Sequence, residues 1–188
     1  IMVHGDNKGL RLPPKVAPTQ IVIVPIMQKD SNVEDILAYI NSLVEELKKN
    51  NIRFYIDTRS KLSPGHKFNE WEMKGVPIRI EVGPRDMDNE ELVICRRDDD
   101  TKQTIKIQNA SNMIMQLLDE IQNNLFNQAK DFMSDHTTSV STWDDFKQHI
   151  NNGFVICGWD GTEETETKIK EETKATIRCL PFKQNIKN

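Results

Sequence analysis

Residues 65–86, GHKFNEWEMKGVPIRIEVGPRD, decide the fold of this chain. Pro64 and Gly65 begin a short helix, and Gly75 ends it at the usual C-terminal capping position. Apolar and polar residues then alternate, which predicts a strand with one apolar face made by Val76, Ile78, Ile80 and Val82. The stretch therefore predicts a helix, a glycine turn and a strand that ends at Gly83.

The predicted helix and strand bring aromatic and charged side chains together. Phe68 and Glu72 lie four residues apart, one above the other on the helix, and Arg79 lies on the polar face of the strand. Arg85 and Asp86 follow just past the strand end. Proteins hold an unstacked RNA base by stacking on an aromatic or guanidinium plane and by hydrogen bonds to the base edges. An arginine can donate to guanine O6 and N7, so this set suits a guanine.

The same residues also fit an ordinary amphipathic helix and a half-buried strand with solvated charges. Short motif matches often occur without the function they suggest. The residues of this stretch alone leave both interpretations open.

Three parts of the chain resemble one known family. The run KFNEWEMKGVPIRIEVGPRD at 67–86 resembles the anticodon-binding domain of the prolyl-tRNA synthetases of archaeal and eukaryotic type. The run MVHGDNKGLRLPPKVAP at 2–18 resembles the end of that family's catalytic domain. The run KIKEET at 168–173, with Pro181 and Phe182, resembles its C-terminal domain. The resemblance therefore covers nearly the whole chain.

The resemblance implies an α/β fold in two parts. The first is a mixed five-stranded sheet with flanking helices, the anticodon-binding fold of class II synthetases, and the second is a small α/β C-terminal domain. We expect residues 1–18 to be a remnant of the catalytic domain with a connector. We expect residues 19–120 to be the anticodon-binding domain and residues 121–188 the C-terminal domain.

The resemblance also implies a function, namely the anticodon-reading part of a proline–tRNA ligase that attaches proline to tRNA(Pro) for protein synthesis. The residues that would bind the anticodon loop are Phe68, Glu72, Arg79, Arg85 and Asp86. In that family the arginine that holds ATP lies upstream of His4, so we expect no catalytic residue and no bound cofactor in this span. ATP, Mg and L-proline would bind the full-length enzyme, which we expect to be a cytoplasmic homodimer. Ile1 is not a natural start, which favours a fragment that lacks its catalytic domain.

Two other functions compete with this one. The same fold can serve as a non-catalytic accessory subunit or protein-interaction module, and the sequence upstream of Ile1 would discriminate it from a synthetase. An unrelated small α/β enzyme has less support, because the sequence has no glycine-rich phosphate loop, no nucleophile elbow and no histidine-rich metal pair.

The composition limits the kind of partner. The net charge is −4 and the pI about 5.6, whereas a general nucleic-acid binder is usually basic. Residues 59–86 hold 6 Lys and Arg against 4 Asp and Glu, and residues 131–174 hold 4 Lys against 10 Asp and Glu. This uneven charge favours a specific RNA contact over indiscriminate binding. The sequence has no run of 18 apolar residues, so we expect no membrane span.

The remaining patterns predict the other elements. We expect Ser31 to cap a helix with Glu34 in a capping box, and the polar loop 97–102 to be solvated. The first two strands and the helix between them favour a parallel βαβ unit. The other predicted strands are 21–26, 52–56, 92–96, 104–107, 154–157 and 176–180, and the other helices are 109–134, 142–151 and 163–173.

The three cysteines, Cys95, Cys157 and Cys179, are widely spaced, which favours reduced thiols in the cytosol. Cys95 follows an apolar run and is expected in the core. The resembled family often carries four zinc-binding cysteines in its last domain. Cys157 stands at the first of these positions, but Thr162 stands at the second, and Cys179 does not match a ligand position.

We therefore predict that the purified protein contains no stoichiometric zinc, because a structural zinc site needs four ligands. Elemental analysis of the protein, prepared without chelator, checks this expectation. One zinc per chain would contradict it.

Overall fold

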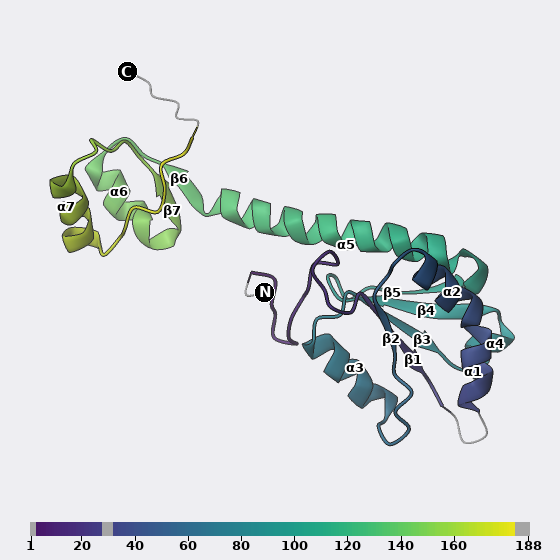
Figure 1. Ribbon diagram of the computed structural model, residues 1–188. Coiled ribbons are helices and arrows are strands. Elements are labelled where there is room, and N and C mark those ends of the chain that lie inside the picture. Colours follow the sequence, from purple (N-terminus) through teal and green to yellow (C-terminus); the bar gives the residue numbers. More distant parts are fainter. Residues whose placement is uncertain (1–2, 28–31, 183–188) are drawn as a thin grey trace. The chain divides into compact units, whose positions relative to one another are not determined.

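The computed structural model describes residues 3–27 and 32–182 (Figure 1). The chain divides into two compact units, residues 1–129 and residues 130–188. Helix α5 (Ile107–Asp135) begins in the first unit and ends in the second. The functional division expected at residues 120 and 121 falls within this helix and stays a prediction.

The first unit is built on a mixed five-stranded sheet, as the sequence predicts. Its order is β2 (Phe54–Ile56), β1 (Ile21–Pro25), β3 (Ile78–Val82), β4 (Glu91–Arg96) and β5 (Lys102–Lys106). Strand β1 runs parallel to both β2 and β3, and β4 is antiparallel to β3 and β5. The predicted parallel βαβ unit is therefore confirmed.

One face of this sheet carries the main hydrophobic core. Four helices cover it or pack along its rim, namely α1 (Val33–Tyr39), α2 (Asn41–Lys49), α4 (Pro84–Asp88) and the first part of α5. Every second residue of the strands points into this core, as the two-residue period of a strand requires. The largest fully buried side chains include Ile21, Ile23, Ile78, Ile80, Leu92, Ile94, Ile114 and Ile121.

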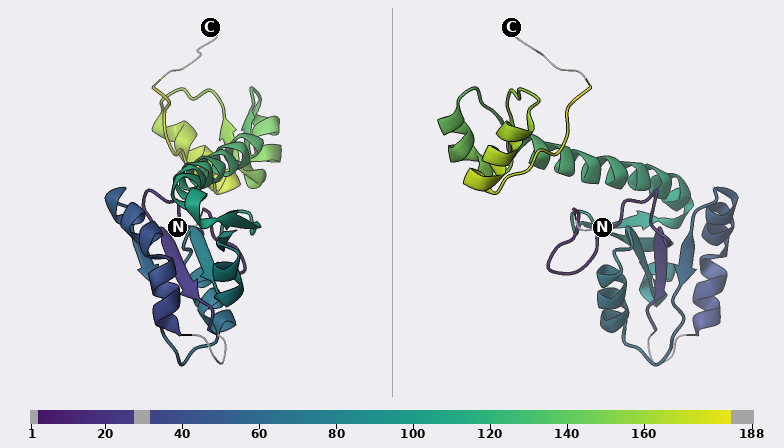
Figure 2. Two further views of the ribbon diagram at one scale, coloured as in Figure 1. Left: turned by 90° about the vertical axis from the view of Figure 1, so that its right-hand side faces the viewer. Right: turned by 60° about the vertical axis from the view of Figure 1, so that its left-hand side comes forward.

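The opposite face is covered only in part. Helix α3 (Pro64–Met73) packs Trp71 and Phe68 onto Val22 and Val24 of β1, so β1 is buried on both faces, as its continuous apolar run predicts. Figure 1 and Figure 2 show α3 on one side of the sheet and α1 on the other. Beyond α3, the face formed by β3, β4 and β5 is predominantly polar. We call the polar side of β3, β4 and β5 the open face.

The structure corrects several local expectations in the first unit. The single helix expected after residue 31 is two helices, which divide at Ile40, yet its apolar stripe still faces the core. Asn32 caps α1 and accepts from the Glu34 amide, whereas Ser31 lies outside the described residues. Val76 precedes β3 and packs beside Trp71 rather than in the main core. The residues just past the end of the predicted strand form the short helix α4.

The second unit is a small βαβ arrangement. Strands β6 (Thr137–Ser139) and β7 (Phe154–Ile156) are parallel, and α6 (Trp143–His149) with the 3-10 turn Ile150–Asn152 lies between them in sequence. Helix α7 (Glu163–Thr173) follows. The strand expected at 176–180 is wrong, because the described residues 174–182 form neither helix nor strand. Cys179 and Leu180 are exposed, so no buried face holds a strand there.

Within the described parts of the chain, no helix combines the length and the apolar character that a membrane crossing needs.

Gly75 joins α3 to β3 in a conformation that favours glycine. Its φ is +72°, and a Cβ atom there would lie 2.7 Å from the Leu10 side chain. The N-terminal segment, which contains Leu10 and Leu12, lies this close to Gly75 because of two backbone hydrogen bonds. The Leu10 amide donates to the Met73 carbonyl at 3.1 Å, and the Leu12 amide donates to the Gly75 carbonyl at 3.1 Å. The glycine therefore serves both the turn and the close approach of the N-terminal segment.

We predict that Gly75→Ala lowers the free energy of unfolding by about 1–3 kcal/mol, because it combines a left-handed backbone with a steric clash. Urea denaturation followed by circular dichroism measures the change. Gly65→Ala is the matched control, since no atom lies within 4 Å of its added Cβ. This control should be as stable as the wild type, or up to about 1 kcal/mol more stable. Equal stability of both variants would contradict the prediction.

Candidate nucleic-acid interface

The strand register places four functional groups on the open face. Arg79 of β3 is paired with Cys95 of β4, and Cys95 is paired with Lys102 of β5. Glu81 follows Arg79 by two residues and therefore lies on the same face. Three strands thus contribute one row of polar side chains.

Arg79 is held on three sides. Its guanidinium carbon lies over the Phe68 ring, 4.3 Å from the ring centroid. Its Nη1 donates to Glu72 Oε1 at 2.9 Å, and its Nε and Nη2 donate to Glu81 Oε1 at 3.2 and 3.1 Å. Burial opposes the charge of Arg79, but Glu72 and Glu81 outweigh it and raise the pKa. The aromatic ring, the carboxylate and the arginine that the sequence grouped together are therefore in contact.

Glu81 is a buried carboxylate, only 4% exposed, which lies beside Arg79, Cys95 and Lys102 and is itself in register with Val93. Besides Arg79, it accepts from Lys102 Nζ at 2.7 Å and from Cys95 Sγ at 3.1 Å. Burial would raise the pKa of Glu81, but these hydrogen bonds and the nearby charges lower it below its ordinary value. Burial and the bond to Glu81 raise the pKa of Cys95 to about 11, so this group is a thiol that donates. Cys95 is buried as expected, yet on the polar face.

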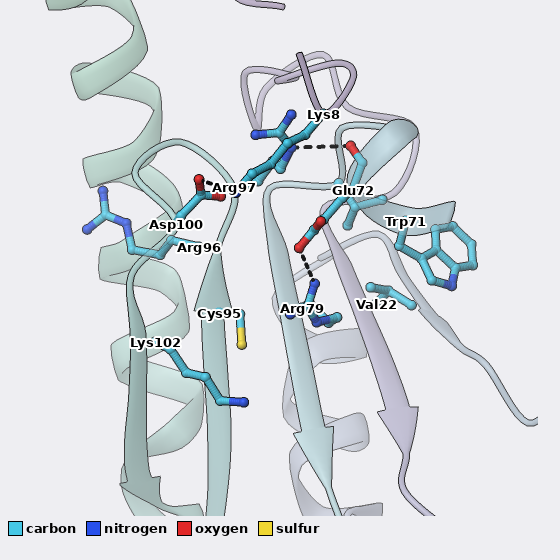
Figure 3. Close-up of a pocket in the computed structure, with 11 residues that line it drawn as sticks. Lys8, Val22, Trp71, Glu72, Arg79, Cys95, Arg96, Arg97, Asp100 and Lys102 are labelled. Atoms are coloured by element: carbon cyan, nitrogen blue, oxygen red, sulfur yellow. Dashed lines mark hydrogen bonds and ion pairs between the residues drawn. The ribbon is translucent and has the colours of Figure 1, made fainter. Parts of the chain in front are cut away.

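A pocket of about 170 Å³ opens between α3, the N-terminal segment and the open face (Figure 3). Arg79, Cys95 and Lys102 point into it from three neighbouring strands, and Glu72 and Trp71 line it from α3. The other lining residues are Lys8, Val22, Val76, Arg96, Arg97 and Asp100. The lining is therefore rich in cations, with the carboxylates of α3 and the β4–β5 loop among them.

The rim of this pocket is fixed by ion pairs between distant segments. Arg97 donates to both oxygens of Asp6 at 2.6 and 2.8 Å, and Lys8 Nζ lies 2.7 Å from Asp100. Asp6 also accepts from the Lys8 amide at 2.8 Å, so it stabilises the N-terminal turn as well. Arg97 chiefly, through its hydrogen bonds, lowers the pKa of Asp6. The N-terminal turn and the β4–β5 loop are therefore joined.

The loop at 97–102 is solvated only in part, because residues 99–102 are exposed as predicted, whereas its first two residues are buried. Arg97 and Asp98 are 4% and 1% exposed. Asp98 accepts from Arg96 at 2.8 and 3.0 Å and from the Asn124 amide at 2.7 Å, so its charge is compensated. The expectation failed for Arg97 and Asp98 because each has a partner from a distant part of the chain, Asp6 for Arg97 and Asn124 for Asp98.

The second predicted pair, Arg85 and Asp86, lies beyond the carboxyl end of β3 and does not line the pocket. Asp86 Oδ2 accepts from the Gly83 amide at 2.8 Å and caps α4. Arg85 is exposed. The structure thus separates the five predicted site residues into two groups. In the pocket group, Glu72 and Arg79 line the pocket, and Phe68 packs against Arg79 without lining it. The other two residues form a group at the start of α4.

Helix α3 is anchored by a buried carboxylate at the end of β2. Asp57 is fully buried and accepts from Arg59 at 2.7 and 2.9 Å and from Trp71 Nε1 at 2.9 Å. Lys67 donates to the Asp57 carbonyl at 2.9 Å. These bonds fix the helix that carries Phe68 and Glu72.

Sequence reasoning missed Glu81 and Lys102 as members of the site. Strand β5 begins two residues earlier than predicted, and residues 102–106 (KQTIK) contain one apolar residue, Ile105, so no local alternation marked Lys102 as part of the strand. Glu81 lies two residues from Arg79 on the same strand face, but its other partners lie on β4 and β5.

Across residues 3–27 and 32–182, no three His, Cys, Asp or Glu side chains are grouped to hold a metal ion. Thr162, at the position where a zinc-binding family member would carry a cysteine, caps α7 by accepting from the Thr165 amide. Cys157 and Cys179 are exposed thiols.

Two protein-family models match different parts of the chain. The family described as "Anticodon binding domain" matches residues 20–117, and the family described as "Prolyl-tRNA synthetase, C-terminal" matches residues 143–188. The first match spans the whole sheet of the first unit.

Relatives and a solved structure agree with these matches. The chain is 44% identical to a proline–tRNA ligase of Roseiflexus sp. (strain RS-1), over 98% of this chain and 39% of that protein. It is 47% identical to a proline–tRNA ligase of Flavobacterium psychrophilum, over 100% of this chain and 39% of that protein. A crystal structure of prolyl-tRNA synthetase from Cryptosporidium parvum, complexed with L-proline and AMP, matches with a TM-score of 0.91 and 40% identity, over 99% of this chain and 41% of that one. The chain thus spans 39% of the length of these two curated relatives.

The anchor of α3 generates a prediction about pH. The pKa of Asp57 in the folded protein is lowered chiefly by hydrogen bonds from Arg59 and also by the one from Trp71. In an unfolded chain the pKa of Asp is about 3.9. This carboxylate therefore adds stability above about pH 4, and the addition is lost as the pH falls toward the folded-state pKa. We expect Asp57→Asn to be less stable at pH 7 and to lose less further stability between pH 5 and pH 2.

Thermal melts of the wild type and Asp57→Asn across this pH range test the prediction. Trp71→Phe is the comparison, because it removes one hydrogen bond to the carboxylate and keeps its charge. It should cost about 1–3 kcal/mol at neutral pH and retain most of the acid-dependent loss. An Asp57→Asn curve parallel to the wild-type curve down to pH 2 would refute this role.

Proposed function

Because this chain belongs to the anticodon-binding domain family and corresponds to the anticodon-binding and C-terminal region of proline–tRNA ligases, we propose that its open face binds the anticodon loop of tRNA(Pro). The observation that carries this proposal is the contact of Arg79 with Phe68 and Glu72 at the pocket. Anticodons for proline carry two guanines, and the pocket offers both donors and acceptors for a guanine.

The hydrogen bonds of Arg79 support a base-reading role. An arginine has five N–H donors, and Arg79 uses one on Nε, one on Nη1 and one on Nη2. One N–H remains on each terminal nitrogen, which is the number that a bidentate contact with guanine O6 and N7 needs. Glu72 uses Oε1 for Arg79, and its Oε2 can accept from a guanine N–H. The guanidinium plane is already fixed by the Phe68 ring, so little side-chain entropy is lost on binding.

Arg85 and Asp86 extend the proposed site past the end of β3. A single-stranded loop can contact both groups at once, because its bases are splayed apart. In this proposal the pocket group holds one guanine, and the group at the start of α4 contacts the neighbouring nucleotide.

The activity of a longer protein that contains this region is a further part of the proposal and rests on similarity. It would attach proline to tRNA(Pro) with ATP and Mg, as a cytoplasmic homodimer. L-proline and AMP are named for the similar Cryptosporidium parvum structure, of which this chain covers 41%. We place the sites for proline and ATP in the remaining length of such a protein.

We predict that Arg79→Ala weakens binding to a stem-loop with a proline anticodon by roughly ten- to a hundredfold, since one bidentate base contact contributes about 1–3 kcal/mol of discrimination. Binding to a stem-loop with both anticodon guanines replaced should weaken much less. Fluorescence titrations of both RNAs at two salt concentrations measure these effects.

Lys106→Ala is the charge control, because Lys106 lies on β5 outside the pocket. It should weaken both RNAs alike and reduce the salt slope by at most about one. Equal losses on both RNAs for Arg79→Ala would remove the base-reading role. Absence of binding by the wild type to either RNA would favour the alternative, a protein-interaction module with the same fold.

A further inference from the structure

Glu81 has a position that the proposed contacts do not explain. It is 4% exposed, whereas Glu72, the carboxylate proposed to touch the base, is only partly buried. Burial of an ionised carboxylate is unfavourable unless charges and hydrogen bonds compensate it. A carboxylate inside a sheet face therefore needs an explanation in terms of its partners.

Those partners come from three strands. Arg79 donates twice to Oε1 from β3, Cys95 donates to the same oxygen from β4, and Lys102 donates to Oε2 from β5. Lys102 is more than half exposed and reaches inward to make this bond, so Glu81 determines where its ammonium group lies. The Glu81 carboxylate thus holds both Arg79 and Lys102, the two cations that line the pocket beside Cys95.

We propose that Glu81 is a positioning residue that fixes Arg79 and Lys102 for guanine recognition without touching the base itself. This inference rests on the proposed function. The Nε and Nη2 atoms of Arg79 form one edge of the guanidinium, and this edge donates to Glu81. The remaining N–H donors of Arg79 are therefore left for the pocket. The bond at Oε2 holds Lys102 on the other side of the same carboxylate, so the two cations are kept apart at a set spacing.

The charge of Glu81 has a second effect, on nonspecific binding. Ion pairs with Glu81 partly neutralise Arg79 and Lys102, which lowers the attraction of this face for any phosphate backbone. Removal of the charge should therefore have opposite effects on two quantities. Discrimination between RNAs should fall, whereas affinity for an RNA without the guanines should stay the same or rise.

The test is a double-mutant cycle of Glu81→Gln and Arg79→Ala, with titrations against the proline-anticodon stem-loop and the guanine-replaced stem-loop. We expect Glu81→Gln to reduce the ratio of the two affinities by about tenfold, which corresponds to about 1.4 kcal/mol. In the Glu81→Gln background, Arg79→Ala should reduce this ratio by a smaller factor than it does in the wild type, because the arginine is no longer positioned. Such non-additivity is the mark of groups that act together, and a role in folding alone would not produce it.

Glu91→Gln is the matched control. Glu91 lies on β4 on the same face and pairs with a lysine of β5 at 3.0 Å, but it does not line the pocket. This variant changes the net charge of the face by the same amount and should leave the ratio of affinities unchanged. Glu81→Asp keeps the charge and should retain more discrimination than Glu81→Gln. Melting temperatures of all variants separate loss of fold from loss of positioning.

The outcomes distinguish this inference from the function on which it rests. If the wild type prefers the guanine-containing RNA and Glu81→Gln keeps that preference, or if the two substitutions are additive, the positioning role is overturned and the proposed function stands. If the wild type shows no preference, both are overturned. If Glu91→Gln lowers the ratio as much as Glu81→Gln, a general charge effect replaces the inference.

Discussion

The open face of the sheet depends on the pairing of a buried carboxylate, Glu81 of β3, with one cation from its own strand and one from β5, the second strand along. A sheet normally buries one apolar face and exposes the other to water. Here the second face is half covered by α3, so the polar side chains beside it are partly desolvated and must satisfy one another. Glu81 does this for Arg79, Cys95 and Lys102 together. The result is a fixed set of donors and acceptors at the edge of a helix.

Further contacts hold the helix, the N-terminal segment and the loop around this face in place. Asp57 anchors α3 through Trp71, and Gly75 allows the N-terminal segment to lie against the end of that helix. Arg97 then joins that segment to the β4–β5 loop through Asp6. Helix α3, the N-terminal turn and the loop therefore enclose the pocket from three directions, and the sheet forms its floor (Figure 3).

Local patterns predicted the helix and strand at the centre of the chain, because both their periodicity and the capping glycine lie in one stretch. The contact of Phe68, Glu72 and Arg79 followed from the same stretch, since only a short turn separates the helix from the strand. The register of β3, β4 and β5 does not follow from any one segment, and it alone brings Lys102 to Glu81. The bond between Arg97 and Asp6 joins residues 91 positions apart, so the burial of Arg97 could not be predicted from the local sequence. The strand expected at 176–180 failed for a related reason, since an alternating pattern needs a buried face to pack against.

The central claim is that RNA binds the open face between α3 and β5, and mapping of backbone amide signals by NMR tests it most directly. A uniformly labelled sample would be titrated with the proline-anticodon stem-loop, and signals would be compared between the two faces of the sheet. The account predicts that the largest changes cluster at α3 and on the open face of β3, β4 and β5, including Arg79 and Lys102. Changes confined to α1 and α2, or to the acidic helix α7, would contradict it.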